Sequence, residues 1–165
     1  MVRILGIDPG TAIVGWGILD CNKSGKNCVT VAYGHIETHK DTPMPSRLSE
    51  ITDNIIAILD KYNPDEVAVE ELFYFKNAKT VISVAEARGV IVNTCFRQNI
   101  IVAEYTPLQI KQSLTGYGRA DKVQMQKMIK SVLKLKNIPK PDDTADALAV
   151  ALCHNNSRAF LQKIN

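Results

Sequence analysis

Four acidic residues stand where the neighbouring residues predict a buried chain. Asp8 ends an apolar run, Glu70 follows Val69 in a short β-rich run, and Asp143 and Asp146 lie three apart before a small apolar helix. Charged residues are almost never buried unless they are paired or bound to a metal. Carboxylate oxygens suit hard cations such as Mg²⁺ or Mn²⁺, and two such ions ~4 Å apart can activate a water and stabilise the leaving oxygen of a phosphodiester. These residues therefore favour metal-dependent phosphodiester hydrolysis.

Each of these acids also has an ordinary structural explanation. Asp8 precedes a Pro-Gly pair and could be a turn residue, and Glu70 could pair with a lysine. Asp143 and Asp146, with the adjacent Asp142, could cap their helix and complement its dipole. The catalytic interpretation therefore depends on whether the fold brings the four carboxylates together.

The hydrophobic periodicity predicts strands mixed with helices. Apolar or alternating runs predict strands at residues 3–8, 13–20, 29–37, 66–71 and 100–105. Helical spacing predicts helices at 46–62 (with Ser46 as N-cap), 77–97, from Thr106-Pro107, 121–135, and from about 142 into the 150s. The expected fold class is α/β: a five-stranded mixed sheet, an antiparallel meander plus parallel strands, with helices on both faces. We expect one domain over residues 1–165.

This topology gives the four acids a way to converge. The strand at 66–71 can pair parallel to the first strand, which brings Asp8 and Glu70 side by side at the carboxyl ends of the two strands. The small residues of the last helix favour packing on the sheet, so that Asp143 and Asp146 would abut the same strand ends. The elements thus predict one acidic cleft.

Composition and charge narrow the class of protein. With 45% hydrophobic and 22% charged residues, the chain is neither disordered nor collagen-like nor a coiled coil. It has no apolar run of ~18 residues and no signal peptide, so we expect a cytoplasmic protein. The net charge is +3, but residues 76–141 contain 12 basic and 3 acidic residues. A basic tract beside catalytic acids favours a nucleic-acid backbone as substrate.

The cysteines are scattered. Cys21, Cys28, Cys95 and Cys153 form no C-x-x-C pair. We expect reduced, partly buried thiols, as is usual in cytosolic proteins. A zinc site from Cys21, Cys28 and a histidine is the alternative.

Six motifs, in order along the chain, resemble a known family. They are Ile4-Leu-Gly-Ile-Asp8-Pro-Gly10, Val69-Glu-Glu-Leu-Phe73 with Lys76-Asn77, Ala87-Arg-Gly89, Ile110-Lys-Gln112, Gly116-x-Gly118-x-Ala-x-Lys122 and Asp143-Thr-Ala-Asp146-Ala-Leu-Ala. From Met1 to about His154 the chain resembles the RuvC family of bacterial Holliday-junction resolvases. The resemblance implies a ribonuclease H-like fold, a homodimer, and paired, symmetric nicking of four-way DNA junctions in recombination and repair. It also implies Mg²⁺ as cofactor, with two ions per site and Mn²⁺ as a substitute, and a branch-migration helicase complex as partner.

The resemblance implies roles for individual residues. Asp8, Glu70, Asp143 and Asp146 would be the catalytic metal ligands. Asp142 departs from the family pattern and adds a candidate ligand, which leaves the metal assignment open. The resemblance assigns Lys111 and Lys122 to the basic surroundings of the site, and Phe73 to junction contact.

Two further features support DNA binding and dimer formation. Gly116 and Gly118 lie between the two lysines and would let the main chain approach phosphates closely. The resemblance assigns much of the dimer contact to the helix at 77–97, where Gly89 lies in a wide stripe of small or branched residues. Those residues are Val81, Val84, Ala85, Ala87, Val90, Ile91 and Thr94.

Three other functions remain to be weighed. Asp8-Pro-Gly-Thr11 resembles the phosphate loop of actin-like ATPases, but those enzymes clamp a nucleotide between two such domains. A non-catalytic DNA-binding module would use the basic tract and would not need Asp8 or Glu70. A related ribonuclease H-like RNA-processing enzyme would differ in substrate and not in mechanism.

Overall fold

The structure is a computed structural model that describes residues 1–22, 25, 27–72 and 78–164, with the main chain only for residues 78, 79 and 159–164. The strands in this part of the chain are β1 (Val2–Asp8), β2 (Ile13–Cys21), β3 (Cys28–Glu37), β4 (Glu66–Glu70) and β5 (Ile101–Tyr105). The helices are α1 (Met44–Tyr62), α2 (Ala78–Arg97), α3 (Pro107–Thr115), α4 (Lys122–Val132) and α5 (Asp142–Ile164).

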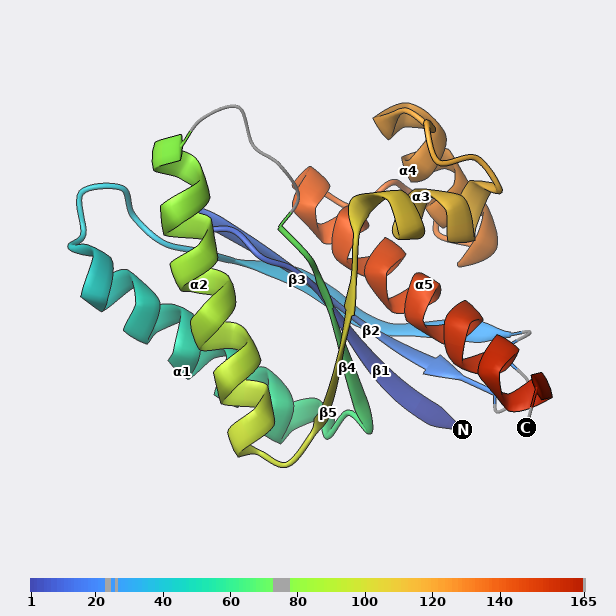
Figure 1. The fold of residues 1–165 in the computed structure, drawn as a ribbon, viewed down its shortest axis with the longest axis horizontal. Coiled ribbons are helices and arrows are strands. Elements are labelled where there is room, and N and C mark those ends of the chain that lie inside the picture. Colours follow the sequence, from blue (N-terminus) through green and yellow to red (C-terminus); the bar gives the residue numbers. More distant parts are fainter. Residues whose placement is uncertain (23–24, 26, 73–77, 165) are drawn as a thin grey trace.

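The strands form a single sheet in the order β3-β2-β1-β4-β5. The first three strands are an antiparallel meander, whereas β4 runs parallel to β1 and β5 runs parallel to β4. Figure 1 shows α1 and α2 on one side of the sheet and α5, with α3 and α4, on the other. The predicted fold class is therefore confirmed.

Alternation along the strands divides the interior into two cores. Ile4 of β1 and Ala68 of β4 pack on the side of α5, with Leu148. Leu5, Ile7, Val67 and Val69 pack on the side of α1 and α2, with Ile51, Ile55, Ala87 and Ile91. Successive side chains of a strand point to opposite faces of the sheet. Asp8 therefore lies on the same face as Ile4, and Glu70 on the same face as Ala68, so both acids face α5.

Glycines in β1 and β2 let α5 lie directly on the sheet. A side chain at Gly6 would collide with the Ala147 carbonyl, and one at Gly15 would collide with the Asp143 carbonyl. The Thr144 hydroxyl also donates to the Gly34 carbonyl of β3 at 3.3 Å. The amino-terminal turns of α5 are thereby fixed over the centre of the sheet.

The helix boundaries follow the sequence signals closely, except that α5 runs to Ile164, beyond the predicted end in the 150s, and that the start of α1 differs. The predicted cap and proline at Thr106-Pro107 are confirmed, and α3 and α4 both begin with complete capping boxes. The prediction of Ser46 as N-cap of α1 is wrong: the helix begins at Met44 after Pro43, with no side-chain cap. A proline is tolerated in the first helical turn because its missing N–H has no partner there. None of the described helices is both long and apolar enough to cross a bilayer.

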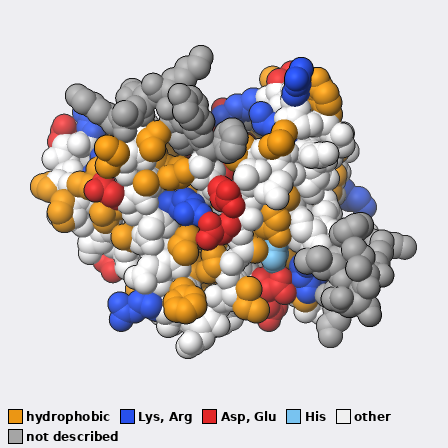
Figure 2. All heavy atoms as spheres, in the orientation of Figure 1, with side chains coloured by type: hydrophobic (Ala, Val, Ile, Leu, Met, Phe, Trp, Pro, Cys, Tyr) orange, Lys and Arg blue, Asp and Glu red, His pale blue; other side chains and the backbone are white. Residues whose placement is uncertain are grey.

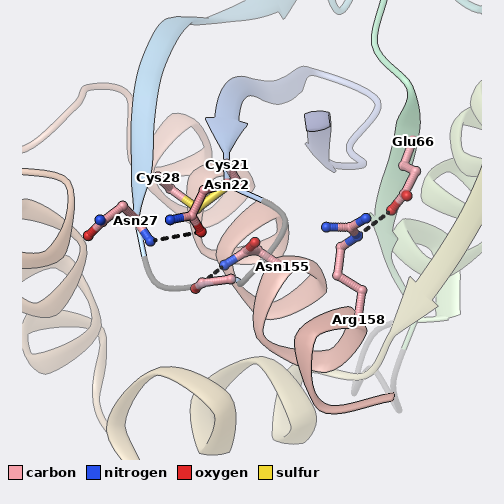
Figure 3. The surroundings of a disulfide bond; sticks show 8 residues. Cys21, Asn22, Asn27, Cys28, Glu66, Asn155 and Arg158 are labelled. Atoms are coloured by element: carbon pink, nitrogen blue, oxygen red, sulfur yellow. Dashed lines mark hydrogen bonds and ion pairs between the residues drawn. A yellow bond between two sulfur atoms is a disulfide. The ribbon is translucent and has the colours of Figure 1, made fainter. Parts of the chain in front are cut away.

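The prediction of four reduced thiols is wrong for two of them. Cys21 and Cys28 form a disulfide across the end of the β2–β3 hairpin, which also rules out their serving as thiolate zinc ligands while oxidised. Figure 3 shows this bond beside Asn155 of α5, whose amide donates to the Gly25 carbonyl at 2.9 Å. Cys95 and Cys153 are free and buried, as predicted.

Candidate active site

Asp8 and Glu70 end neighbouring parallel strands. The register pairs Ile7 with Val69, so the next residue of each strand lies beside the other. Both side chains are partly buried on the α5 side, and a hydrogen bond links the two carboxyl groups. The predicted juxtaposition of these two acids is therefore present in the structure.

The start of α5 adds the other two acids. Asp143 and Asp146 lie in its first turns, and both are near enough for their charges to raise the pKa of Asp8. Asp146 and Glu70 also line one pocket of about 280 Å³. The sheet, through β1 and β4, and the helix, through its first turns, thus bring the four predicted carboxylates together.

The electrostatics of this cluster are unfavourable within the protein itself. Burial, followed by the charges of Glu70 and Asp146, raises the pKa of Asp8 well above its ordinary value. Burial raises the pKa of Glu70 as well, although the hydrogen bond to Asp8 and the charge of Lys111 oppose the rise. Burial also raises the pKa of Asp146, against the opposing effect of Lys122. Proximity and burial therefore both disfavour the ionised carboxylates.

This donor set fits a hard divalent cation. The four carboxyl groups supply oxygen ligands only, and a bound cation would offset the repulsion that raises the pKa of Asp8. Within the residues that the structure describes, no three acidic, histidine or cysteine side chains are already spaced to hold a metal ion. Cation binding would therefore require small side-chain rotations, among them release of Asp146 from Lys122, whose Nζ lies 3.6 Å from Asp146 Oδ2.

Lys111 and Lys122 lie beside the acids. Both line the same pocket as Glu70 and Asp146, together with Pro107, Ile110, Met125 and Ala149. Other lysines of α4, Lys127 and Lys130, are exposed, and Figure 2 shows basic side chains over and around this helix at the top of the view. The predicted pairing of acids with basic side chains is therefore present.

Asp142 differs from its neighbour Asp143. Lys140 Nζ lies 2.6 Å and Lys122 Nζ 3.2 Å from its two oxygens, and the Gln126 amide donates to it at 3.0 Å. Hydrogen bonds from the two lysines lower the pKa of Asp142 to about 2. This carboxylate is thus held by three side chains of the protein, which favours a structural role over that of the additional ligand considered from sequence.

One of the two glycines between the lysines has a local structural explanation. Gly116 ends α3 in the left-handed conformation, with φ of 71° and its N–H donating to the Gln112 carbonyl. A side chain at Gly118 would meet only the end of the exposed Leu108 side chain, which can rotate away. The predicted role of both glycines in DNA binding stays a prediction. Phe73, predicted to contact the junction, lies outside the described residues.

Sequence reasoning missed two sets of contacts of β4, one behind the site and one at the opposite end of the strand. Arg88 of α2 donates through Nε to the main-chain carbonyl of Glu70 at 3.2 Å. On the α5 side, His154 Nε2 lies 2.6 Å from Glu66 Oε2, and Tyr105 Oη lies 2.8 Å from His154 Nδ1. The only signal in the sequence for the second set is that Glu66 and Glu70 are four apart in a strand, and so share a face.

With the site in place, comparison with known proteins identifies the family. The family model for crossover junction endodeoxyribonuclease RuvC matches residues 4–154. The chain belongs to the RuvC family. The resemblance inferred from the six motifs is therefore confirmed.

Individual RuvC proteins are similar over nearly their whole lengths. The crossover junction endodeoxyribonuclease RuvC of Caldicellulosiruptor saccharolyticus is 55% identical over 153 residues, which are 93% of this chain and 92% of that protein. The RuvC of Finegoldia magna is 52% identical, with the same coverage. Thermus thermophilus RuvC in complex with a Holliday junction substrate superposes with a TM-score of 0.90 at 30% identity, covering 97% of this chain and 96% of that one. The ribonuclease H-like fold is thus shown by the RuvC structure as well as by the topology.

Proposed function

We propose that this chain is a divalent-metal-dependent endonuclease that resolves four-way DNA junctions by paired, symmetric cuts in recombination and repair. The observation that carries the proposal is the convergence of Asp8, Glu70 and Asp146 at one end of the sheet, with Asp143 beside them and with Lys111 and Lys122 as the cations that line the same pocket. RuvC-family membership over residues 4–154 supports the same conclusion.

The four carboxylates would hold two Mg²⁺ ions, with Mn²⁺ as a substitute. When bound, such ions activate the attacking water and stabilise the leaving oxygen of the phosphodiester. Asp8 is the acid most dependent on a cation, because burial and its acidic neighbours raise its pKa. Since a protonated carboxyl group is a poor ligand, protons and metal ions would compete for this cluster.

Lys111 and Lys122 would hold the scissile backbone against the acids. They line the pocket that contains Glu70 and Asp146, so a phosphate there would meet both charges. Lys122 is paired with Asp142 and Asp146. Its ammonium would therefore move toward the phosphate when cations occupy the carboxylates. The basic tract supplies the sequence-independent part of DNA affinity.

We propose a homodimer through the outward face of α2. Part of the predicted stripe is inward: Ala87, Ile91 and Thr94 are buried in the subunit. The exposed face carries Ile82, Ala85, Gly89 and Phe96, and Figure 2 shows hydrophobic side chains over this side of the molecule. The exposed fractions of Ile82 and Phe96, 63% and 73%, are large for apolar side chains. A two-fold dimer would give one junction two active sites for its two equivalent strands.

Three further parts of the proposal rest on the family resemblance: junction contact by Phe73, a branch-migration helicase complex as partner, and a cytoplasmic location. The location also follows from the proposed substrate, because a protein that cuts chromosomal junctions would act where the chromosome lies. In a two-fold dimer Phe73 would contact the junction centre, where bases are partly unstacked and can stack on a ring.

The test offers three substrates: a synthetic four-way junction, a linear duplex and an RNA–DNA hybrid, each in Mg²⁺ and in chelator. We expect paired nicks in the junction, in Mg²⁺ only. Asp8→Asn should abolish nicking and leave junction affinity equal or higher, since repulsion of phosphate falls. Asp53→Asn, at an exposed site on α1, is the matched control. Preferred cutting of the hybrid would favour RNA processing, and tight junction binding without cutting would favour a non-catalytic module.

The dimer has its own test. A side chain added at Gly89 meets nothing within 4 Å in the subunit, so Gly89→Glu should leave the fold intact. Sedimentation should show a dimer for the wild type at micromolar concentration and a monomer for Gly89→Glu, which should nick one strand without the paired cut. Ala57→Glu on the exposed surface of α1 should remain dimeric. A wild type that sediments as a monomer on junction DNA would refute the paired mechanism.

A further inference from the structure

Arg88 holds two neighbouring strand ends to α2. Its Nε donates to the main-chain carbonyl of Glu70 at 3.2 Å, and its Nη2 pairs with Glu104 Oε2. Glu70 is the last residue of β4, and Glu104 lies one residue before the end of β5. Only 20% of the Arg88 side chain is exposed. The guanidinium therefore bonds acceptors on both strands at once. Its planar shape and several N–H donors suit it to this double contact.

This contact lies on the opposite face of the sheet from the acidic cluster. Val69 and Val102 pack on the α2 side, whereas Ala68 packs on the α5 side. Alternation then places the Glu104 side chain on the α2 side and the Glu70 carboxylate on the α5 side. Arg88 holds the Glu70 main chain from behind, out of reach of anything that the carboxylate binds.

The Glu70 carbonyl is at the point where the chain leaves the sheet. The Glu71 N–H still donates to the Tyr105 carbonyl at 2.8 Å, but β4 itself ends at Glu70. At the end of a strand, main-chain hydrogen bonds to the neighbouring strands no longer hold both the N–H and the carbonyl of each peptide. A side-chain donor on the Glu70 carbonyl restricts rotation of its peptide, and with it the direction of the carboxylate.

We propose that Arg88 is a positioning residue for Glu70. The proposal rests on the proposed function in one respect, that Glu70 binds a metal ion. The proposal makes the geometry of Glu70 depend on α2, the helix whose outward face carries Gly89. Arg88, which contacts the strand end, and Gly89, on the exposed face, are adjacent in that helix.

The test compares metal binding in Arg88→Gln, Arg88→Lys and Glu104→Gln with the control Arg97→Gln, at an exposed position at the end of α2. Mn²⁺ affinity is measured by electron paramagnetic resonance without DNA. The Mg²⁺ concentration for half-maximal single-turnover cleavage, junction affinity in chelator and thermal midpoint are measured in parallel. Arg88→Gln should weaken Mn²⁺ binding and raise the Mg²⁺ requirement by about tenfold, which is the usual effect of removing an outer partner of a ligand. Junction affinity in chelator should not change.

The other variants separate positioning from general stability. Glu104→Gln keeps Arg88 and removes one of its two partners, so it should shift the Mg²⁺ requirement less and in the same direction. Arg88→Lys keeps the charge but cannot bond both acceptors as a fork, so it should fall between Arg88→Gln and the wild type. If Arg88→Gln does not fold, a shifted Mn²⁺ affinity in Glu104→Gln supports the proposal and an unshifted one overturns it.

Two results would overturn the proposal outright: Arg88→Gln with the metal affinities of Arg97→Gln, or Arg88→Gln with weakened junction binding in chelator. The second would make Arg88 a DNA-binding residue. A wild type that cuts no junction, while Mn²⁺ affinity still falls in Arg88→Gln, would refute the proposed function and leave the positioning role standing.

Discussion

Strand β4 carries a glutamate at each end, Glu66 and Glu70, on the same face and against the same helix. Glu66 is paired within the protein: His154 Nε2 lies 2.6 Å and Arg158 Nε 3.1 Å from its Oε2, and Figure 3 shows the Arg158 contact. Glu70 instead faces Asp8 and Asp146, and its pKa is raised. Two glutamates of one strand thus face the same helix, but Glu66 has basic partners there and Glu70 has acidic neighbours.

The difference separates a structural carboxylate from a functional one. Removing one partner from a buried ion pair is costly because it leaves the other charge uncompensated. At Glu66 both partners belong to the chain, so the contact is complete on folding. At Glu70 the acids outnumber the nearby cation, Lys111, so the remaining positive charge has to come from a bound ion or ligand outside the protein. Charge balance therefore identifies the site more sharply than burial does, since both glutamates are partly buried.

Glu70→Gln should have the largest effect on chemistry. We expect junction cleavage to fall by about a thousandfold or more, because a ligand of the metal ions is lost. In chelator the same change should raise the thermal midpoint. The raised pKa of Glu70 means that its ionised form costs stability as pH rises through the folded-state value, and glutamine does not ionise.

This gain in stability should vanish in acid. Below the ordinary range of a glutamate both proteins carry an uncharged group at this position, and their melting curves should coincide. Equal cleavage by the mutant and the wild type in Mg²⁺ would contradict the assignment of Glu70 as a ligand.

Glu66→Gln should show the reverse pattern. Breaking the pair leaves Arg158 and His154 without their carboxylate, at a cost of about 3 kcal/mol. For a chain of this size the thermal midpoint should fall by about 2–4 °C for each kcal/mol, measured by calorimetry. Cleavage per folded molecule at a permissive temperature should stay within about threefold of the wild type, since Glu66 holds no metal. A thousandfold loss at that temperature would remove the contrast between the two glutamates.

A smaller effect should appear in the pH dependence of stability. Burial lowers the pKa of His154, although Glu66 opposes the shift. The unfolded chain therefore binds a proton more readily than the folded one, and the stabilising contribution is present above the ordinary histidine value of about 6.5 and lost as pH falls below it. Melting temperatures between pH 7.5 and 5.5 should fall more steeply in the wild type than in His154→Gln. Parallel curves would show that His154 does not titrate in this range.

The smallest effect should come from Asp142→Asn. Asp142 is held by Lys140, Lys122 and Gln126, so cleavage should change by no more than about twofold, whereas Asp143→Asn should abolish it. The two neighbours are matched in residue type and helix position. A severe loss in Asp142→Asn under the same single-turnover conditions would make it a ligand.

The parts of the site that follow from strand geometry could be predicted from the sequence. Asp8 and Glu70 end apolar strands that the topology allows to pair as parallel neighbours, as they do in the structure, and Asp143 and Asp146 precede a helix of small residues. Contacts that cross between elements at single points could not. Arg88 stands in the Ala87-Arg-Gly89 motif, but nothing in the sequence pairs its side chain with Glu70 or Glu104, and His154 breaks no periodic pattern.

The disulfide was not predicted, because the scattered cysteines and the expected cytosolic location favoured reduced thiols. The β2–β3 register shifts by one residue between Ile18 and Leu19, and only after this shift does Cys21 lie opposite Cys28. Without the irregularity Cys21 would pair with Val29. A hairpin read from hydrophobic pattern alone assumes regular pairing, and a bulge of this kind has no clear signature in this chain.

The missing side chains at Gly6 and Gly15 have a mechanical consequence. At these two positions the main chain of α5 rests directly on the strand main chain, with no side chain between them. The helix cannot approach the sheet further at these points without main-chain collision, which restrains the main chains of Asp8 and the two helical acids relative to one another. Adjustment to cations of different radius would therefore fall on rotation of the carboxylate side chains, such as release of Asp146 from Lys122, and not on movement of the helix.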